Sequence, residues 1–228
     1  MNKKEDIVMS WSGGKDSSFA LFQLLSQGKY NVKYLLTNIF KPNKRVSMHG
    51  VPESLIEKQA KNIGIPLIKL YIEEKTHNEY DEKMRVLLLS LKDKGITKVA
   101  FGDIFLEDLK IYREGKLREV GMEALFPLWE KDTKILANQF LKEGFKTHIC
   151  SIDTGKIPRG LIGIDFSNSF INLLPKKVDP CGENGEFHSF CYDGPIFKSE
   201  IHFKKNGIVK KTYSHNKEDY HYLFSDIS

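Results

Sequence analysis

The chain has 228 residues, of which 40% are hydrophobic and 29% charged, and its formal net charge is +5. This length accommodates one sizeable α/β core and a smaller second region, but not two full-sized domains. No apolar run approaches the roughly 20 residues that cross a bilayer, so we expect a soluble protein with no membrane partner. The charge is spread along the chain without a basic tail, which argues against a nucleic-acid partner.

The cysteines and the N-terminus indicate a cytoplasmic protein. Cys150, Cys181 and Cys191 are too far apart for a CxxC pair and odd in number, so we expect buried or idle thiols rather than a disulfide framework. The charged N-terminus leads within a few residues into an apparent strand, with no signal-peptide core before it. The oligomeric state stays open, a homo-oligomer included.

Strands and helices alternate over the first half of the chain. Short apolar runs at residues 7–10, 32–39, 67–72 and 98–101 predict strands. Helical spacing of apolar residues predicts helices at 19–25, 52–63 and 84–91, the last two followed by glycines placed to end them. This alternation predicts βαβ crossovers and a largely parallel, doubly wound sheet, which binds ligands at the carboxyl ends of its strands.

The pattern changes towards the C-terminus. A helix at 133–143, capped by Asp132, leads to a strand at 145–152, after which turns become frequent. The segment 201–213 carries Asn206-Gly207 at its centre, which predicts a type I′ hairpin turn. We therefore expect a first domain at residues 1–152 and a smaller α+β region at residues 153–228.

The segment between the first strand and the first helix has the composition of a phosphate-binding loop, Ser10-Trp11-Ser12-Gly13-Gly14-Lys15-Asp16-Ser17. Backbone N–H groups and the positive end of the following helix can hold an anion there. The glycines allow close approach of the backbone, hydroxyls can donate hydrogen bonds, and we expect an exposed Lys15 to neutralise phosphate. The loop lacks the Ser or Thr after Gly-Lys that a Walker A loop requires, which disfavours P-loop kinases and GTPases.

In this position Ser12 to Ser17 resembles the PP-loop of the ATP pyrophosphatases, which are adenine nucleotide alpha hydrolase-like proteins. Gly102-Asp103-Ile104, Pro127-Leu128-Trp129 and Cys181 to His188 follow in order, and together with the loop they resemble the diphthine–ammonia ligase family. Residues 105–114 look more like bacterial members of that family. The resemblance implies a Rossmann-like, HUP-type fold, ATP and Mg²⁺ as cofactors, and a small or protein-borne carboxylate substrate that is joined to ammonia or an amine.

The resemblance and the chemistry of the side chains also imply roles for particular residues. The expected nucleotide-binding residues are Ser10, Ser12, Gly13, Gly14, Lys15, Asp16, Ser17, Met48, His49 and Gly102. Mg²⁺ is expected on Asp16 and Asp103. The expected catalytic residues are Lys15, Asp103, Glu183, Glu186 and His188, and the expected substrate-binding residues are Arg113, Trp129, Asn184 and Gly185.

Plainer interpretations remain open at this point. Asp103 also fits a turn, His49 the surface, Arg113 a helix-surface ion pair and Trp129 the core. The 183–188 stretch crowds acids, an amide and an imidazole together, so it can bind Mg²⁺, hold an amine or supply a general base, but a polar turn is the alternative. If it is functional, it must face the loop across a cleft at the strand ends.

The reaction that the resemblance implies has two steps. A carboxylate attacks the α-phosphorus of ATP to give an acyl-adenylate and pyrophosphate, and ammonia or an amine then displaces AMP. One rival is sulfur transfer to a tRNA base, for which the chain lacks a paired CxxC and an RNA-binding appendage. The other is a non-catalytic adenine-nucleotide-binding module, against which the 183–188 cluster speaks.

Overall fold

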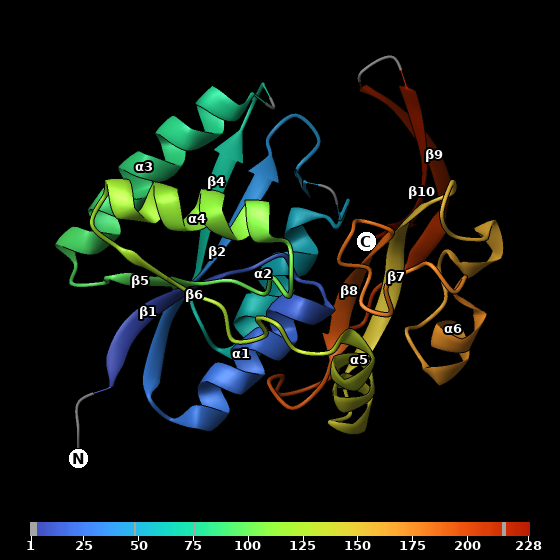
Figure 1. Ribbon diagram of the computed structural model, residues 1–228, viewed down its shortest axis with the longest axis horizontal. Coiled ribbons are helices and arrows are strands. Elements are labelled where there is room, and N and C mark those ends of the chain that lie inside the picture. Colours follow the sequence, from blue (N-terminus) through green and yellow to red (C-terminus); the bar gives the residue numbers. More distant parts are fainter. Residues whose placement is uncertain (1–3, 48, 75, 216–217) are drawn as a thin grey trace.

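The computed structural model describes residues 4–228 except 48, 75 and 216–217, and contains two sheets (Figure 1). The first has six strands, β1 (Glu5–Ser10), β2 (Tyr30–Phe40), β3 (Arg45–Val46), β4 (Leu67–Ile72), β5 (Lys98–Ala100) and β6 (Glu123–Leu125). Its parallel strands lie in the order β4-β2-β1-β5-β6, and β3 adds to β2 in the antiparallel sense. Numbered along the chain, this is the 3-2-1-4-5 order of a Rossmann-like sheet.

Helices cover both faces of this sheet, as the alternating sequence predicts (Figure 1). Ile7 and Met9 of β1 pack with α1 (Lys15–Gln27) and α2 (Glu53–Ile63). Between them, Val8 packs on the other face with α3 (His77–Asp93) and α4 (Glu107–Glu119). All three side chains are 0% exposed, because a central parallel strand is covered on both sides. The expected doubly wound α/β fold is confirmed.

The second sheet is antiparallel and has the order β8-β7-β10-β9. Its strands are β7 (Lys146–Asp153), β8 (Phe187–Asp193), β9 (Lys205–His215) and β10 (Glu218–Ile227). The short helix α6 (Asn168–Leu173) lies in the connection from β7 to β8, and α5 (Thr133–Lys142) precedes β7. Asp132 caps α5 as expected, accepting a hydrogen bond from the backbone N–H of Ile135.

Strand β7 corrects the placement of the strand that we expected at 145–152 within the first domain. It pairs with β8 and β10 and has no pairing with the first sheet among the described residues. Its residues are buried from Thr147 to Asp153, a pattern that is also typical of the interior of a parallel sheet. We propose that the division between the two parts falls between β6 and α5.

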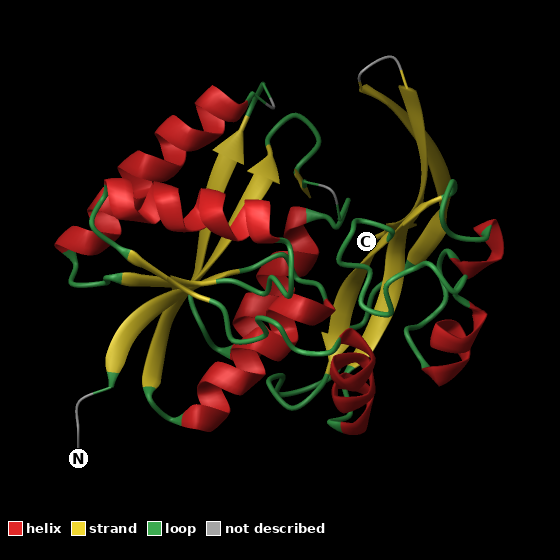
Figure 2. Ribbon diagram, in the orientation of Figure 1, coloured by secondary structure: helices red, strands yellow, loops and turns green. Residues whose placement is uncertain are grey.

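The hairpin turn predicted at Asn206-Gly207 is wrong. Lys205 pairs with Ile227 and Gly207 with Asp226, so Asn206 is an extra residue within β9, a β-bulge. The strand continues to His215, and the far ends of β9 and β10 stand apart from the neighbouring elements (Figure 2). The pattern misled because a glycine with positive φ, here 138°, suits a bulge as well as a turn.

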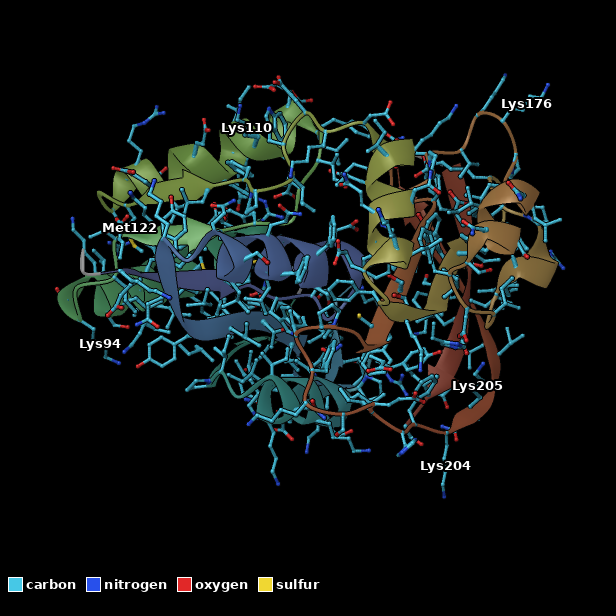
Figure 3. The ribbon with its side chains drawn as sticks, turned by 90° about the horizontal axis from the view of Figure 1, so that it is seen from below. Lys94, Lys110, Met122, Lys176, Lys204 and Lys205 are labelled. Carbon is cyan, nitrogen blue, oxygen red and sulfur yellow. The ribbon has the colours of Figure 1, made fainter. Side chains whose placement is uncertain are left out.

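The positive charge is dispersed over the surface. Lys94, Lys176 and Lys204 are exposed and point outward from separate parts of the chain (Figure 3). Within the described residues, no helix is both long enough and apolar enough to span a membrane.

Gly102, directly after β5, provides a test of how closely the first sheet packs on α1. A Cβ at Gly102 would lie 2.9 Å from both the carbonyl carbon of Asp16 and the backbone nitrogen of Ser17. We expect Gly102→Ala to lower the free energy of unfolding by about 1–3 kcal/mol, because backbone cannot move aside as a flexible side chain can. Urea denaturation measures the change.

The matched control is Gly115→Ala in α4, where the new Cβ would meet nothing within 4 Å. Alanine in a helix interior is favoured over glycine by about 0.5–1 kcal/mol, so this variant should be slightly more stable than wild type. An unfolding midpoint for Gly102→Ala at or above that of wild type would show that the close contact is not a constraint.

Candidate active site

The loop from Trp11 to Gly14 lies at the topological switch point of the first sheet. It follows β1, while Gly102 and Asp103 follow the adjacent parallel strand β5. The crossovers from these two strands leave towards opposite faces, and such a point is where open α/β sheets bind ligands. The contact of Gly102 with the backbone of Asp16 shows that the two loops touch.

The loop gathers hydrogen-bond donors at the start of α1. The hydroxyl oxygens of Ser12 and Ser17 are 3.1 Å apart, and the Gly14 N–H donates to Ser12 Oγ at 3.3 Å. Gly14 is the N-cap of α1 and has no side chain with which to cap it. Hydroxyls, backbone N–H groups and the positive helix end therefore face one space, an arrangement suited to an anion.

Lys15 is buried, which corrects the expectation that it is exposed. Its side chain is 3% exposed, and Nζ donates to both carboxylate oxygens of Asp16, at 2.7 and 2.8 Å, and to the carbonyl of Cys181. Burial acts to lower the pKa of Lys15, but the negative charge of Asp16 outweighs it and the pKa is raised. Lys15 is therefore a protonated ammonium held inside the protein.

The C-terminal segment covers Lys15 because residues 181–191 fold directly onto the loop. The backbone N–H of Lys15 donates to Ser189 Oγ at 3.2 Å, and the N–H of Cys191 donates to the carbonyl of Gly13 at 2.8 Å. The polar cluster thus lies on the same side of the molecule as Lys15. Ser189 was not among the expected site residues, since a single serine after the motif carries little signal in the sequence.

Within the cluster, Glu183 reaches across to the first sheet. Its Oε1 accepts a hydrogen bond from the backbone N–H of Ile104 at 2.7 Å, next to Gly102 and Asp103. Burial, followed by the charge of Asp16, raises the pKa of Glu183 to about 7, although the Ile104 N–H opposes the shift. This carboxyl group therefore titrates near neutral pH, the range required of an acid–base catalyst.

Glu186 supports the cluster from within. It is 3% exposed, and Oε1 accepts hydrogen bonds from Asn184 Nδ2 at 3.1 Å and from the backbone N–H of Asp179 at 3.3 Å. Oε2 is buried without a hydrogen-bond partner among the described residues. Asn184 is exposed, and Gly185 has a φ of 74° in open space, so these two residues fit the simpler interpretation of a polar turn.

Two histidines meet beside the loop. The rings of His49 and His188 have centroids 4.6 Å apart, and His49 Nδ1 lies 3.2 Å from the carbonyl oxygen of Ser189. Burial lowers the pKa of His49 to about 4 and that of His188 well below its usual value, so both rings are neutral at pH 7. Of the described residues, none is a hydrogen-bond partner for His188 Nε2, which is buried. Met48, expected beside His49, lies outside the described residues.

Asp103 and Arg113 form a pair at the edge of the site. Arg113 Nε lies 2.9 Å from Asp103 Oδ2, Nη2 donates to Oδ1 at 3.1 Å, and the guanidinium lies 4.3 Å from the ring centre of Phe101. Arg113 therefore holds a residue of the β5 loop instead of forming an ion pair on the helix surface. Trp129 is half-buried, with Lys110 Nζ 4.4 Å from its ring centre, and is not a core aromatic.

Carboxylates gather around the loop without forming a ready metal cage. The described residues contain no group of three or more His, Cys, Asp or Glu side chains that could hold a metal ion. Asp16 is paired with Lys15, and its pKa is raised first by burial and further by the nearby charges of Asp179 and Asp103. Mg²⁺ is commonly held by one or two carboxylates together with substrate phosphates, and the carboxylates beside the loop, Asp16 and Asp103, are each paired with a cationic side chain.

A pocket of about 40 Å³ adjoins the loop on the α3 and α4 side of the sheet. It begins at Ser10, the last residue of β1, and is bounded by Tyr80 and Met84 of α3 and by Phe101 and Arg113. Its walls are mainly apolar or aromatic, with charged side chains at one side, as in many sites for small organic ligands.

A donor-rich loop at the switch point of a Rossmann-like sheet, closed by an acidic and imidazole-bearing segment, defines a nucleotide-binding enzyme of the PP-loop class. The chain belongs to the diphthamide synthase family, since it matches the diphthamide synthase N-terminal domain over residues 5–124 and the C-terminal domain over residues 132–222. The family that the sequence motifs resemble is thereby confirmed.

Named relatives span most of the chain. Over 213 residues the chain is 25% identical to the diphthine–ammonia ligase of Danio rerio, and this match covers 83% of each of the two chains. It is 22% identical over 222 residues to that of Homo sapiens, covering 87% of this chain and 82% of the relative. A crystal structure described as a predicted subunit of tRNA methyltransferase from Methanocaldococcus jannaschii is similar with a TM-score of 0.44 and 18% identity, covering 86% of this chain and all of the other. The named relatives are ligases, and the expectation of an ATP-dependent ligase is confirmed.

The raised pKa of Glu183 predicts a pH-dependent contribution to stability. An acid whose pKa rises on folding binds more protons in the folded than in the unfolded state between about pH 4.5 and 7, so stability falls as pH rises through that window. The free energy of unfolding is measured by urea denaturation at pH 5 and at pH 8. We expect its decrease between these two pH values to be about 1–3 kcal/mol smaller in Glu183→Gln than in wild type. The exposed Glu82→Gln on α3 is the control, and an equal pH slope in wild type and Glu183→Gln would contradict the assignment.

Proposed function

We propose that the protein is an AMP-forming ligase that adenylates a carboxylate with ATP and transfers the acyl group to ammonia or an amine. The observation that supports this most directly is the contact between the donor-rich loop and the 181–191 segment. One side of the contact carries hydroxyls, N–H groups and an ammonium, and the other carries carboxyls and the neutral imidazole of His188. A polyphosphate binds to hydrogen-bond donors and positive charge, and an amine binds to hydrogen-bond acceptors and to a base.

On the ATP side, the demand is to stabilise negative charge on the departing pyrophosphate. The Gly14 N–H and the Ser12 hydroxyl are positioned donors, and the Ser17 hydroxyl, which donates to the carbonyl of Gly14, lies beside them. Lys15 supplies the positive charge, and to meet a phosphate its ammonium exchanges the carbonyl of Cys181 for a phosphate oxygen. Asp16 and Asp103 would hold Mg²⁺, which would supply further charge neutralisation. The pocket that begins at Ser10 is the space that we assign to the adenine ring, because its walls are mainly apolar or aromatic.

On the acceptor side, the amine must lose a proton as it attacks the acyl-adenylate. A neutral imidazole can accept that proton, and His188 is neutral with its Nε2 unused by the described residues. Glu186 Oε2 and Glu183 offer acceptors for the N–H groups of an ammonium or amine. Trp129, together with Arg113 where it pairs with Asp103, is assigned to contact with the acid.

The family indicates the chemical class of the acid substrate, a carboxylate, but not its identity. The relatives are named for the joining of diphthine and ammonia, so a diphthine-like carboxylate is the first substrate to test. Residues 105–114 include the first half of α4 beside Asp103, and they look more like bacterial members of the family. A panel of small carboxylic acids therefore belongs in the same screen.

The rival hypothesis of sulfur transfer to tRNA meets a specific difficulty. Cys150, Cys181 and Cys191 are between 0% and 4% exposed. Burial raises the pKa of both Cys181 and Cys191 to about 12, and raises that of Cys150 as well. A sulfur carrier requires a thiolate near neutral pH, and these thiols remain protonated there.

The spent nucleotide tests the proposal directly. Because the loop is of the PP-loop type and not Walker A, we expect AMP and pyrophosphate as products, and no ADP or inorganic phosphate. Ion-exchange chromatography of the reaction with candidate acids and ammonium measures this. ADP as the product would refute the adenylation step, and the absence of any nucleotide product with every acid would favour the non-catalytic binding module.

The two half-sites should separate in mutants. Lys15→Ala is expected to lower pyrophosphate release at least 100-fold, because it removes a charged donor to the leaving group. Glu186→Gln and His188→Ala should keep ATP affinity within a few-fold of wild type and lose amide formation.

Isothermal titration with ATP and a mass-spectrometric assay of the amide measure the two steps, and urea denaturation checks that each variant is folded, since Lys15 is buried. Amide formation by His188→Ala at the wild-type rate would contradict the proposal that the 183–188 cluster takes part in the reaction.

A further inference from the structure

Gln59 is a fully buried amide beneath the phosphate-binding loop, and nothing in the site described above assigns it a role. It lies in the second half of α2, between the loop and the second sheet, and its side chain is 0% exposed. Polar groups in such a position must be hydrogen-bonded, and the identity of their partners shows what they hold in place.

Gln59 joins three segments that are far apart in the sequence. Its Oε1 accepts a hydrogen bond from Trp11 Nε1 at 2.9 Å. Its Nε2 donates to the carbonyl oxygen of Gly13 at 2.9 Å and to that of Cys191 at 2.6 Å. The amide therefore uses its carbonyl oxygen as an acceptor and both of its N–H groups as donors. No other side chain of similar size offers one acceptor and two donors in this arrangement.

The bond to Gly13 determines which way the neighbouring peptide group points. In a trans peptide, the carbonyl of one residue and the N–H of the next point in opposite directions. The carbonyl of Gly13 is held on the α2 side by Gln59 and by the Cys191 N–H at 2.8 Å. The N–H of Gly14 consequently points to the opposite side, where it meets Ser12 Oγ at 3.3 Å among the hydroxyls of the loop.

The fit between Gln59 and the loop is also steric. Gly13 has a φ of 77°, and a Cβ at that position would lie 2.6 Å from Gln59 Oε1 and 2.5 Å from Ile56 Cδ1. The glycine permits the backbone to lie directly on α2, and the amide in turn holds that left-handed conformation.

We propose that Gln59 is a positioning residue that orients the Gly13–Gly14 peptide so that the Gly14 N–H faces the phosphates of ATP. This inference rests on the proposed function, in which ATP binds at the loop. Gln59 touches no reacting atom, and it acts through the peptide group that it holds. Without it the carbonyl of Gly13 keeps only the bond from the Cys191 N–H, so the peptide group is held less firmly and the Gly14 N–H is a less well preorganised donor to the charged triphosphate.

The test uses two replacements of Gln59 and a control on the same helix. Gln59→Met keeps the volume but cannot hydrogen-bond to the Gly13 carbonyl. Gln59→Glu keeps the shape, and can donate to one carbonyl only when protonated. The control, Asn62→Leu, removes a comparable bridge from α2 to the second part, because Asn62 Nδ2 donates to the carbonyl of Ser199 at 2.9 Å and Oδ1 accepts from the N–H of Lys198 at 2.7 Å. Within the described part of the chain, the side-chain hydrogen bonds of Asn62 go to residues 198–199 and not to the loop.

The measurements are the Kd for the non-cleavable analogue α,β-methylene-ATP, by titration calorimetry, and kcat and KM for pyrophosphate release. We expect Gln59→Met to weaken analogue binding about 10-fold to 100-fold, the effect of a lost hydrogen bond to a charged group, and Asn62→Leu to leave it within 2-fold of wild type. The affinity of Gln59→Glu for the analogue should be higher at pH 6 than at pH 8, because the carboxyl group regains a donor on protonation. Gln59→Met, which cannot be protonated, corrects for any pH dependence of the rest of the site.

Each outcome decides the proposal. Wild-type affinity in Gln59→Met, or an equal loss in Asn62→Leu, would overturn it, the second because the loss would then come from docking of the second sheet. Should Gln59→Met fail to fold by urea denaturation, the pH-dependent affinity of Gln59→Glu decides alone, and no dependence overturns the proposal. Failure of the wild type to bind the analogue would instead refute ATP binding at the loop, which separates the two claims.

Discussion

The hydrogen bond from the Cys191 N–H to the carbonyl of Gly13 joins β8 of the second sheet to the loop that follows β1 of the first. Around it lie the bonds that Gln59 donates to the carbonyls of Gly13 and Cys191, and the bond from the Lys15 N–H to Ser189 Oγ. Because these contacts are made by backbone and buried amide groups, the second sheet cannot move relative to the loop without leaving polar groups unpaired inside the protein, which is costly. These contacts, which we call the seam, hold the second sheet against the loop and so keep the site covered.

The seam explains the electrostatics of the site. Covering the loop removes water from Lys15, and a buried ammonium must then find acceptors, which Asp16 and the Cys181 carbonyl provide. The same removal of water raises the pKa of Glu183 and lowers those of His49 and His188. An acid that titrates near neutral pH and imidazoles that stay neutral thus arise together from one packing arrangement.

The packing also divides roles between groups that look alike in the sequence. Glu183 and Glu186 are three residues apart, yet Glu183 spans to the Ile104 N–H while Glu186 turns inward to the Asp179 N–H. Arg113 pairs with Asp103, so the β5 loop presents a paired and oriented carboxylate beside the loop that follows β1. The chemistry proposed for the site depends on these orientations as much as on residue type.

The parallel sheet, its crossover helices and the loop from Ser12 to Ser17 could be predicted from the sequence. Buried strands, amphipathic helices and glycine stops are local patterns that report local structure. The strand β7 and the bulge at Asn206 could not be assigned in this way, because a buried strand looks the same in either sheet and a glycine with positive φ suits a turn or a bulge. Family motifs pointed to the 183–188 cluster, but neither the burial of Lys15 nor the role of Gln59 could be predicted. Both depend on segments more than 100 residues apart, which the sequence leaves unconnected until hydrophobic burial brings the two sheets together.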